Sequence, residues 1–275
     1  MRRVRAFRRI ARVVDRRVWA TLYGVPHPVR IYLLRNGSYL LNRRSPEPRM
    51  AALVLAILRT RTSACFWDVG AHIGYYSWLV ASASPGTKVL AIEPDPTNYA
   101  MLQESRAYAP QVDILDVAVS RADGSATFLR DDVSGASGTL ERQQETFNLR
   151  NYGETSQPMA VRTRSLDSVA LERGFPDFLK IDIEGHEAQA LEGGAHLLAR
   201  RPLILIEAFD PSSPALAQLR AAGYRLLGAD SLTDALPHDG NYLAIAAEEA
   251  GLLSPLREAY RRALADAGVT AAAGS

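Results

Sequence analysis

The strongest constraint on the fold is a regular alternation between short apolar runs and helical stretches that begins at residue 64. Each apolar run is six or seven residues long, which is typical of strands. Apolar runs of this kind are buried on both faces, and intervening helices favour parallel pairing. The sequence therefore predicts an α/β fold with a doubly wound sheet. The expected strands are 64–69, 87–92, 111–117, 177–183, 202–208, 223–228 and 241–247, and the expected helices are 74–83, 96–108, 167–174, 187–199 and 214–222.

Residues 120–163 interrupt this alternation with four glycines and two short strand-like pieces, 125–130 and 159–164. We expect an insertion at the ligand-facing edge of the sheet, placed as a lid would be. The chain then divides into an N-terminal extension over 1–61, a main domain over 62–248 that contains the insertion 120–163, and a C-terminal helix and tail over 249–275.

Charge is divided unevenly along the chain, although the net charge is only +2. Residues 1–61 carry 15 arginines and two acidic residues, whereas residues 62–275 carry 17 basic and 28 acidic residues. A basic arm on an acidic body indicates an anionic partner at the N-terminus, or an arm that packs on its own body.

The N-terminal extension is expected to contain an amphipathic helix, a hairpin and a second helix. Residues 2–19 place apolar side chains at three- and four-residue steps among eight arginines, which is typical of a basic amphipathic helix. The runs 29–34 and 39–41 flank Asn36–Gly37 and predict a hairpin, and residues 47–59 predict a helix.

Three partners for the basic helix stay open: the acidic body of the protein, an anionic membrane surface and nucleic acid. Nucleic acid is the least favoured, because no nucleic-acid motif or interleaved aromatic residues accompany the arginines. The single cysteine, Cys65, allows no internal disulfide, and the longest apolar run, 50–58, has nine residues where a membrane span needs about 20. We therefore expect a cytoplasmic protein, with peripheral contact at the inner membrane surface as the open question.

A glycine loop follows the first strand of the main domain. Asp68 ends that strand, and Gly70 and Gly74 are spaced G-x-x-x-G rather than G-x-G-x-x-G as in a dinucleotide site. Glycines let the backbone turn sharply and let a ligand approach it. A carboxylate at Asp68 would repel a pyrophosphate and would suit a cationic head, such as the amino group of a methionine moiety.

A second acidic residue, Glu93, ends the next strand 25 residues later. Its two carboxylate oxygens can accept both hydroxyls of a ribose through charge-assisted hydrogen bonds. Asp95 is expected to cap the following helix, with Pro96 at its first position. This arrangement favours S-adenosylmethionine, while a nicotinamide cofactor remains the competing interpretation.

The third motif runs from Lys180 to Glu187 after a buried strand. Period-2 alternation puts Lys180, Asp182 and Glu184 on one side, at the carboxyl end of a strand where open α/β sheets bind ligands. Unpaired buried charge is costly, so we take Lys180, Asp182, Glu184 and His186 as the catalytic candidates. Glu187 opens the next helix, where an acid also favours the helix dipole.

At these motifs the chain resembles the FkbM-type family of S-adenosylmethionine-dependent methyltransferases. The string from Lys180 to Glu187 is specific for the family, whereas the glycine loop is shared by many methyltransferases. The resemblance covers 64–209 well and 210–247 loosely. The residues that carry it are Asp68–Ser77, Glu93–Pro96, Ala118–Ser120, Ser165–Ser168, Lys180–Glu187, Leu191–Ala195 and Pro202–Glu207.

The resemblance implies a Rossmann-like, seven-stranded class I methyltransferase fold. It also implies methyl transfer to oxygen on a sugar, a glycolipid or a polyketide-like secondary metabolite. His72 stands where the family often has asparagine, and the helix after Pro96 ends without the family's common asparagines. The candidates for binding the cofactor are Asp68, Gly70, Ala71, His72, Gly74, Tyr75, Glu93, Pro94 and Ala118, with Ala118 beside the adenine.

The expected chemistry is an in-line displacement in which a base removes the hydroxyl proton of a small-molecule, glycan or lipid-linked acceptor. Glu184 or His186 would be that base, Asp182 would orient it or the cofactor, and Lys180 would keep the carboxylates ionised. A divalent metal held by Asp182, Glu184 and Glu207 is the less favoured alternative. A nicotinamide-dependent oxidoreductase and a non-catalytic cofactor-binding, membrane-associated module are the other two classes left open.

Overall fold

A computed structural model describes residues 15–41, 45–130, 138–140, 157–238 and 240–269. Its centre is a seven-stranded sheet with the spatial order β11-β12-β10-β9-β3-β4-β5. The seven predicted apolar runs all form strands of this sheet, which confirms the predicted fold class. The strands are β3 (Cys65–Val69), β4 (Lys88–Ile92), β5 (Val112–Leu115), β9 (Phe178–Ile181), β10 (Leu203–Ala208), β11 (Tyr224–Gly228) and β12 (Gly240–Ala246).

The sheet is parallel except at one strand, β12. β12 pairs antiparallel with both β10 and β11, whereas β3 pairs parallel with β4 and β9. The chain reaches β3 first and then fills one side with β4 and β5 before crossing over to β9. The strand order therefore reverses between β3 and β9, and ligands bind at such a switch point in open α/β sheets.

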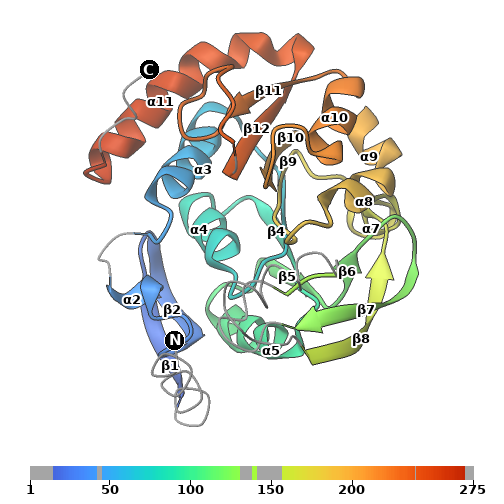
Figure 1. The fold of residues 1–275 in the computed structure, drawn as a ribbon. Coiled ribbons are helices and arrows are strands. Elements are labelled where there is room, and N and C mark those ends of the chain that lie inside the picture. The colour runs from blue at the N-terminus through green and yellow to red at the C-terminus, as the bar shows by residue number, and fades with distance from the viewer. Residues whose placement is uncertain (1–14, 42–44, 131–137, 141–156, 239, 270–275) are drawn as a thin grey trace, which may run out of the picture.

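Helices cover both faces of the sheet (Figure 1) because successive strand residues point to opposite faces. Phe66 and Val89 join a core with α3, α4 and α11, whereas Trp67 and Leu90 join a second core with α7 to α10. The predicted helix 187–199 is broken at Gly193–Gly194 into α8 and α9. The helices here are α3 (Pro48–Thr60), α4 (Tyr75–Ala83), α5 (Pro96–Ser105), η1 (Arg106–Tyr108), α7 (Leu166–Arg173), α8 (Glu187–Glu192), α9 (Ala195–Ala199), α10 (Pro214–Ala221), η2 (Ala247–Leu252) and α11 (Leu253–Asp266).

The predicted insertion contributes most of a second, three-stranded sheet with the order β6-β8-β7. These strands are β6 (Ala118–Val119), β7 (Gly124–Arg130) and β8 (Gln157–Arg164). Both strand-like pieces predicted in the insertion are therefore confirmed. Residues 131–137 and 141–156 lie outside the described part of the chain.

The N-terminal extension corrects two predictions. Strand β1 (Arg17–Leu22) pairs antiparallel with β2 (Val25–Tyr32), so the hairpin turns at Tyr23–Gly24 and not at Asn36–Gly37. The predicted partner 39–41 instead lies in the short helix α2 (Ser38–Leu41). The predicted helix 2–19 cannot include Arg17–Trp19, which lie in β1, and its residues 2–14 lie outside the described part.

The hairpin was misplaced because the Asn36 side chain has another role. Its Oδ1 accepts the N–H of Tyr32 at 2.9 Å, and this bond turns the chain out of β2 toward α2. Gly24 has φ +73 and supplies the left-handed residue at the true turn. Within the described ranges, no helix combines the length and the apolar character needed to cross a bilayer.

Candidate active site

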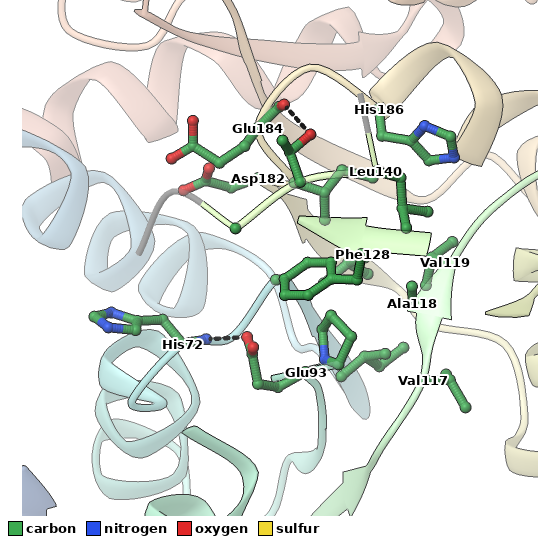
Figure 2. Close-up of a pocket in the computed structure, with 17 residues that line it drawn as sticks. His72, Glu93, Val117, Ala118, Val119, Phe128, Leu140, Asp182, Glu184 and His186 are labelled. Atoms are coloured by element: carbon green, nitrogen blue, oxygen red, sulfur yellow. Dashed lines mark hydrogen bonds between the residues drawn. The ribbon is translucent and has the colours of Figure 1, made fainter. Parts of the chain in front are cut away.

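A pocket lies at the carboxyl ends of β3, β4 and β9, at the switch point of the sheet (Figure 2). It holds about 530 Å³ of empty space, its open mouth included. Eight of the predicted site residues line it: Gly70, His72, Glu93, Pro94, Ala118, Asp182, Glu184 and His186.

The glycine loop is pressed against the end of β9. Gly70 has φ +80, and a Cβ at that position would lie 1.8 Å from the main-chain oxygen of Asp182. His72 also has a left-handed backbone, with φ 54, which costs a non-glycine residue about 1–2 kcal/mol. Only glycine at position 70 lets the loop reach Asp182 and open the pocket between β3 and β9.

Glu93 ties the glycine loop to β4. Its Oε2 accepts the N–H of His72 at 2.8 Å, and its Oε1 accepts the N–H of Asp95 at 2.9 Å. The side chain is buried, and burial raises the pKa of Glu93 to about 8. Asp95 caps α5 through the N–H groups of Thr97 and Asn98, as predicted. At neutral pH this shift favours the protonated acid, and the oxygens of Glu93 can accept hydrogen bonds from vicinal hydroxyls in either protonation state.

The side of the pocket near Ala118 is apolar. Val117, Ala118 and Val119 supply its floor, and the ring of Phe128 from β7 lies over it (Figure 2). A Cβ on Gly138 would come within 2.3 Å of that ring, so Gly138 makes room for it. Sequence reasoning missed Phe128, although it stands in a predicted strand beside a glycine-rich segment.

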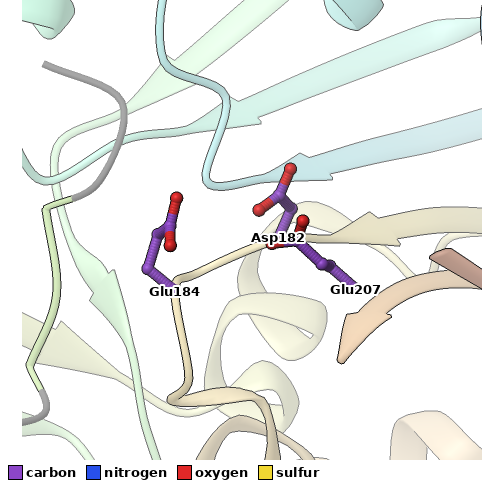
Figure 3. Close-up of side chains that lie close together, drawn as sticks. All are labelled: Asp182, Glu184 and Glu207. Carbon is purple, nitrogen blue, oxygen red and sulfur yellow. The ribbon is translucent and has the colours of Figure 1, made fainter. Parts of the chain in front are cut away.

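Three carboxylates gather at the opposite end of the pocket (Figure 3). Asp182, Glu184 and Glu207 each place an oxygen within 4.8 Å of the other two. Burial, followed by the charge of Asp182, raises the pKa of Glu207 to about 10. This shift favours the protonated form of Glu207, whose hydrogen bond to Asp182 lowers the pKa of Asp182. Like charges this close cannot all ionise.

Lys180 lies beneath this cluster and does not line the pocket. Its Nζ is 2.6 Å from Asp182 Oδ2, and its ammonium stands 5.1 Å from the centre of the Tyr76 ring. Burial alone would lower the pKa of Lys180, but the charges of Asp182, Asp68 and Glu47 outweigh burial and raise it. Conversely, burial would raise the pKa of Asp182, and Lys180 together with a hydrogen bond from Glu207 lowers it.

Glu184 and His186 take different directions from the same turn. Glu184 has φ 55, its main-chain oxygen accepts Thr139 Oγ1 at 2.8 Å, and its carboxylate lies with Asp182. The His186 ring points away from these carboxylates in Figure 2, and its Nε2 lies 3.0 Å from Ser120 Oγ.

Glu187 supports the turn that carries Glu184 and His186. Its Oε1 accepts the N–H groups of Ile183 and Gly185 at 3.1 and 3.2 Å. Burial raises the pKa of Glu187 to about 7. Glu187 is placed to hold the Ile183–His186 turn in shape.

The four other predicted residues support the loop from outside the pocket lining. Asp68 is 1% exposed, and its Oδ2 accepts both the N–H and the Oγ–H of Ser77 at the start of α4. Gly74 precedes α4 with φ +81, and Tyr75 donates its hydroxyl to the main-chain oxygen of Tyr23. Ala71 is buried, and its N–H donates to the oxygen of Ile92.

The N-terminal extension also reaches the site, through Asn36, a residue that the sequence did not single out. Asn36, only 2% exposed, places its Nδ2 3.3 Å from His72 Nε2. Because an amide nitrogen donates only, Nε2 accepts and the ring proton belongs on Nδ1. Tyr76 donates its hydroxyl to Glu47 at 2.6 Å, behind Lys180.

Two curated relatives are described as methyltransferases, and both extend beyond the matched region. The hexuronic acid methyltransferase AglP of Haloferax volcanii is 27% identical over 146 residues, which are 51% of this chain and 54% of the relative. The 2-O-methyltransferase NoeI of Sinorhizobium fredii is 24% identical over 151 residues, which are 52% and 62%. The match therefore covers little more than half the length of these two relatives.

A solved structure, a putative caffeoyl-CoA O-methyltransferase from Staphylococcus aureus, is 15% identical with a TM-score of 0.45, over 78% of this chain and 91% of that one. The methyltransferase FkbM domain matches residues 68–226, which include the glycine loop, Glu93 and the Lys180–Glu187 motif. This match confirms the resemblance predicted from the sequence and does not favour the oxidoreductase alternative. The chain belongs to the FkbM family of methyltransferases.

Proposed function

We propose that the protein is an S-adenosylmethionine-dependent O-methyltransferase that acts on a hydroxyl of a sugar, a glycolipid or a polyketide-like metabolite. The observation that carries the proposal is the pocket itself. The pocket brings together an apolar surface, the buried carboxyl group of Glu93 and the acidic side chains of Asp182 and Glu184.

The residues of the pocket fit the cofactor in its three parts. Val117–Val119 and Phe128 offer an apolar seat for adenine. Glu93 offers carboxylate oxygens to the ribose hydroxyls, and the Gly70–His72 backbone lies at the expected place of the methionine moiety. When bound, S-adenosylmethionine supplies an activated methyl group on a positively charged sulfur. Carboxylates at Asp182 and Glu184 favour a cation at this end of the pocket.

Glu184 is our candidate for the base that accepts the hydroxyl proton. Its carboxylate lies with Asp182 in the pocket, whereas the His186 ring is directed to Ser120. Asp182 is already paired with Lys180 and shares the proton of Glu207. Bound S-adenosylmethionine would supply the methyl group to the acceptor oxygen, and Glu184 would accept the proton that the hydroxyl loses.

We propose that this chemistry needs no metal ion. The three carboxylates Asp182, Glu184 and Glu207 have the spacing of a cation site, but an acidic cluster alone does not require a cation. The ammonium of Lys180 and the proton shared by Asp182 and Glu207 reduce the charge that a metal would otherwise have to balance.

The names of two relatives support the acceptor class. One relative is described as a hexuronic acid methyltransferase and another as a 2-O-methyltransferase. A hydroxyl acceptor agrees with a site whose candidate base is a carboxylate, because alignment and proton removal are what such a transfer requires.

The cofactor part of the proposal is tested by thermal unfolding with different ligands. S-adenosylhomocysteine should raise the midpoint of the wild-type protein, and it should raise the midpoint of Glu93→Ala much less. NAD should leave the wild-type midpoint unchanged. A midpoint raised by NAD and not by S-adenosylhomocysteine would favour the oxidoreductase alternative and end this proposal.

A further inference from the structure

Exposed apolar side chains gather on the lobe made by β1, β2 and α2. Among the residues that the structure describes, seven large apolar side chains are exposed. Single exposed leucines are ordinary, but a concentration on one lobe marks an interaction surface. Four of the seven belong to the lobe, and a fifth, Tyr108, contacts Trp19 with ring centroids 5.4 Å apart. The four are Trp19, Leu33, Leu34 and Leu40.

Three of these side chains come from a single turn. Leu33 and Leu34 follow β2 directly, the N–H of Gly37 donates to the oxygen of Leu34, and the N–H of Leu40 donates to the oxygen of Gly37. We call Leu33, Leu34 and Leu40 the leucine tip. The N–H of Leu33 also donates to the main-chain oxygen of Arg16, so the tip lies beside the start of β1. Trp19 lies three residues after Arg16 in the chain, roughly 10 Å from it along the strand. Figure 1 shows this lobe beside the main sheet, on the side of α3 and α4.

The lobe carries arginines, and the sequence on either side of it is rich in arginine. Within the lobe, Arg17 and Arg30 pair with Glu104, and Arg35 pairs with Asp15. The chain enters the lobe at Asp15 directly from residues 1–14, which carry six arginines and no acidic residue. Residues 42–44, directly after α2, add two more arginines. Exposed apolar side chains on a lobe whose flanking sequence is arginine-rich match the interface of a bilayer that contains anionic lipids.

We propose that this lobe docks the protein on an anionic lipid bilayer, with the leucine tip and Trp19 in the interfacial layer. Tryptophan favours that layer because its ring is apolar and its N–H is polar. The proposal goes beyond the assigned reaction and holds for any acceptor.

Docking would also bring the pocket to the membrane. Asn36 lies between Leu34 and Leu40 in the tip's turn, and its amide contacts His72 on the pocket wall. The pocket would then lie near the layer in which a lipid-linked hydroxyl is presented.

Sedimentation of the full-length protein with vesicles tests the proposal. We expect binding to vesicles of phosphatidylcholine with phosphatidylglycerol, weaker binding to phosphatidylcholine alone, and release at about 0.5 M salt. Leu33→Ser combined with Leu34→Ser should weaken binding at least about tenfold. The matched control is Leu171→Ser on α7, at a leucine that is 82% exposed, and it should bind like the wild type.

Fluorescence gives a second readout because Trp67 and Trp78 are fully buried and Trp19 is exposed. Anionic vesicles should shift the emission to shorter wavelength, and Trp19→Phe should remove the shift. If the tip variant and Trp19→Phe bind S-adenosylhomocysteine as the wild type does, both variants are folded.

Three outcomes would overturn the proposal. The first is no binding of the wild type to anionic vesicles. The second is equal loss for Leu171→Ser and the tip variant. The third is that the wild type forms an oligomer, the tip variant is a monomer, and neither protein binds vesicles. The tip would then be a contact between copies of this chain.

Discussion

The ammonium of Lys180 lies 2.6 Å from Asp182 Oδ2, and its side chain is only 4% exposed. This pair stands directly under the pocket, where Lys180 also neighbours Asp68 on the adjacent strand. Removing one partner of a buried pair leaves the other charge uncompensated, whereas an exposed pair contributes little. The pair therefore links the stability of the fold to the charge of the site.

Lys180→Met tests that link. Without the ammonium, the pKa of Asp182 and the pKa of Asp68 should both rise, and the protein should lose about 3–5 kcal/mol of unfolding free energy. Urea unfolding measures the loss. Arg162→Met, which breaks the exposed pair with Asp116, is the control and should cost less than about 1 kcal/mol. Equal losses of unfolding free energy in the two variants would show that the buried pair contributes no more to stability than the exposed pair.

Gly70→Ala should disrupt the pocket. A Cβ would meet the main-chain oxygen of Asp182 at 1.8 Å, and φ is +80, so the loop must move away from β9. We expect a loss of more than about 1 kcal/mol in stability and weaker binding of S-adenosylhomocysteine in calorimetry. Gly86→Ala is the matched control, because nothing lies within 4 Å of its Cβ position. Wild-type affinity in Gly70→Ala would refute the assigned role of the loop.

Glu207 should make stability depend on pH. Its folded pKa of about 10 lies above the ordinary value of 4.5, so the folded protein keeps a proton that the unfolded chain releases. The contribution of this proton is complete below about pH 4.5 and is lost as the pH rises toward 10, with a slope of at most about 1.4 kcal/mol per pH unit.

Glu207→Gln keeps a neutral donor to Asp182, and its melting temperature should fall less than that of the wild type between about pH 6 and 9. Glu258→Gln, at an exposed side chain, should keep the wild-type profile. Parallel profiles for the wild type and Glu207→Gln would contradict a protonated Glu207.

Metal removal separates the two uses of the acidic cluster. If Lys180 and the shared proton balance the charges of Asp182, Glu184 and Glu207, methyl transfer should survive treatment with EDTA and dialysis. An added divalent ion should not raise the rate. Activity that disappears with EDTA and returns with Mg²⁺ or Mn²⁺ would assign the three carboxylates to a metal.

The sheet could be predicted because each of its strands is visible in the sequence as a short apolar run. The run 203–206 is apolar and buried at every position, so burial on both faces leaves one interpretation. The antiparallel direction of β12 depends on which neighbours it pairs with, and a periodicity of two does not contain that information.

The missed parts of the site depend on contacts far apart in the sequence. Asn36 meets His72 across 36 residues, and its local pattern, Asn-Gly, suggested a hairpin turn instead. Phe128 reaches the pocket because β7, inside the insertion, pairs with the distant strand β8. By contrast, Asp182, Glu184 and Glu93 were predictable, because strand ends in an open sheet converge.

The most direct test of the account is transfer of label from methyl-tritiated S-adenosylmethionine to glycan and lipid extracts, with the wild type, Glu184→Gln and His186→Asn. We predict labelled acceptor with the wild type, a loss of about 10²–10⁴-fold with Glu184→Gln at unchanged S-adenosylhomocysteine affinity, and a smaller loss with His186→Asn. Equal labelling by the wild type and Glu184→Gln would contradict the assigned base. No labelled acceptor in any extract, from a protein that binds S-adenosylhomocysteine, would contradict the proposed O-methyltransferase.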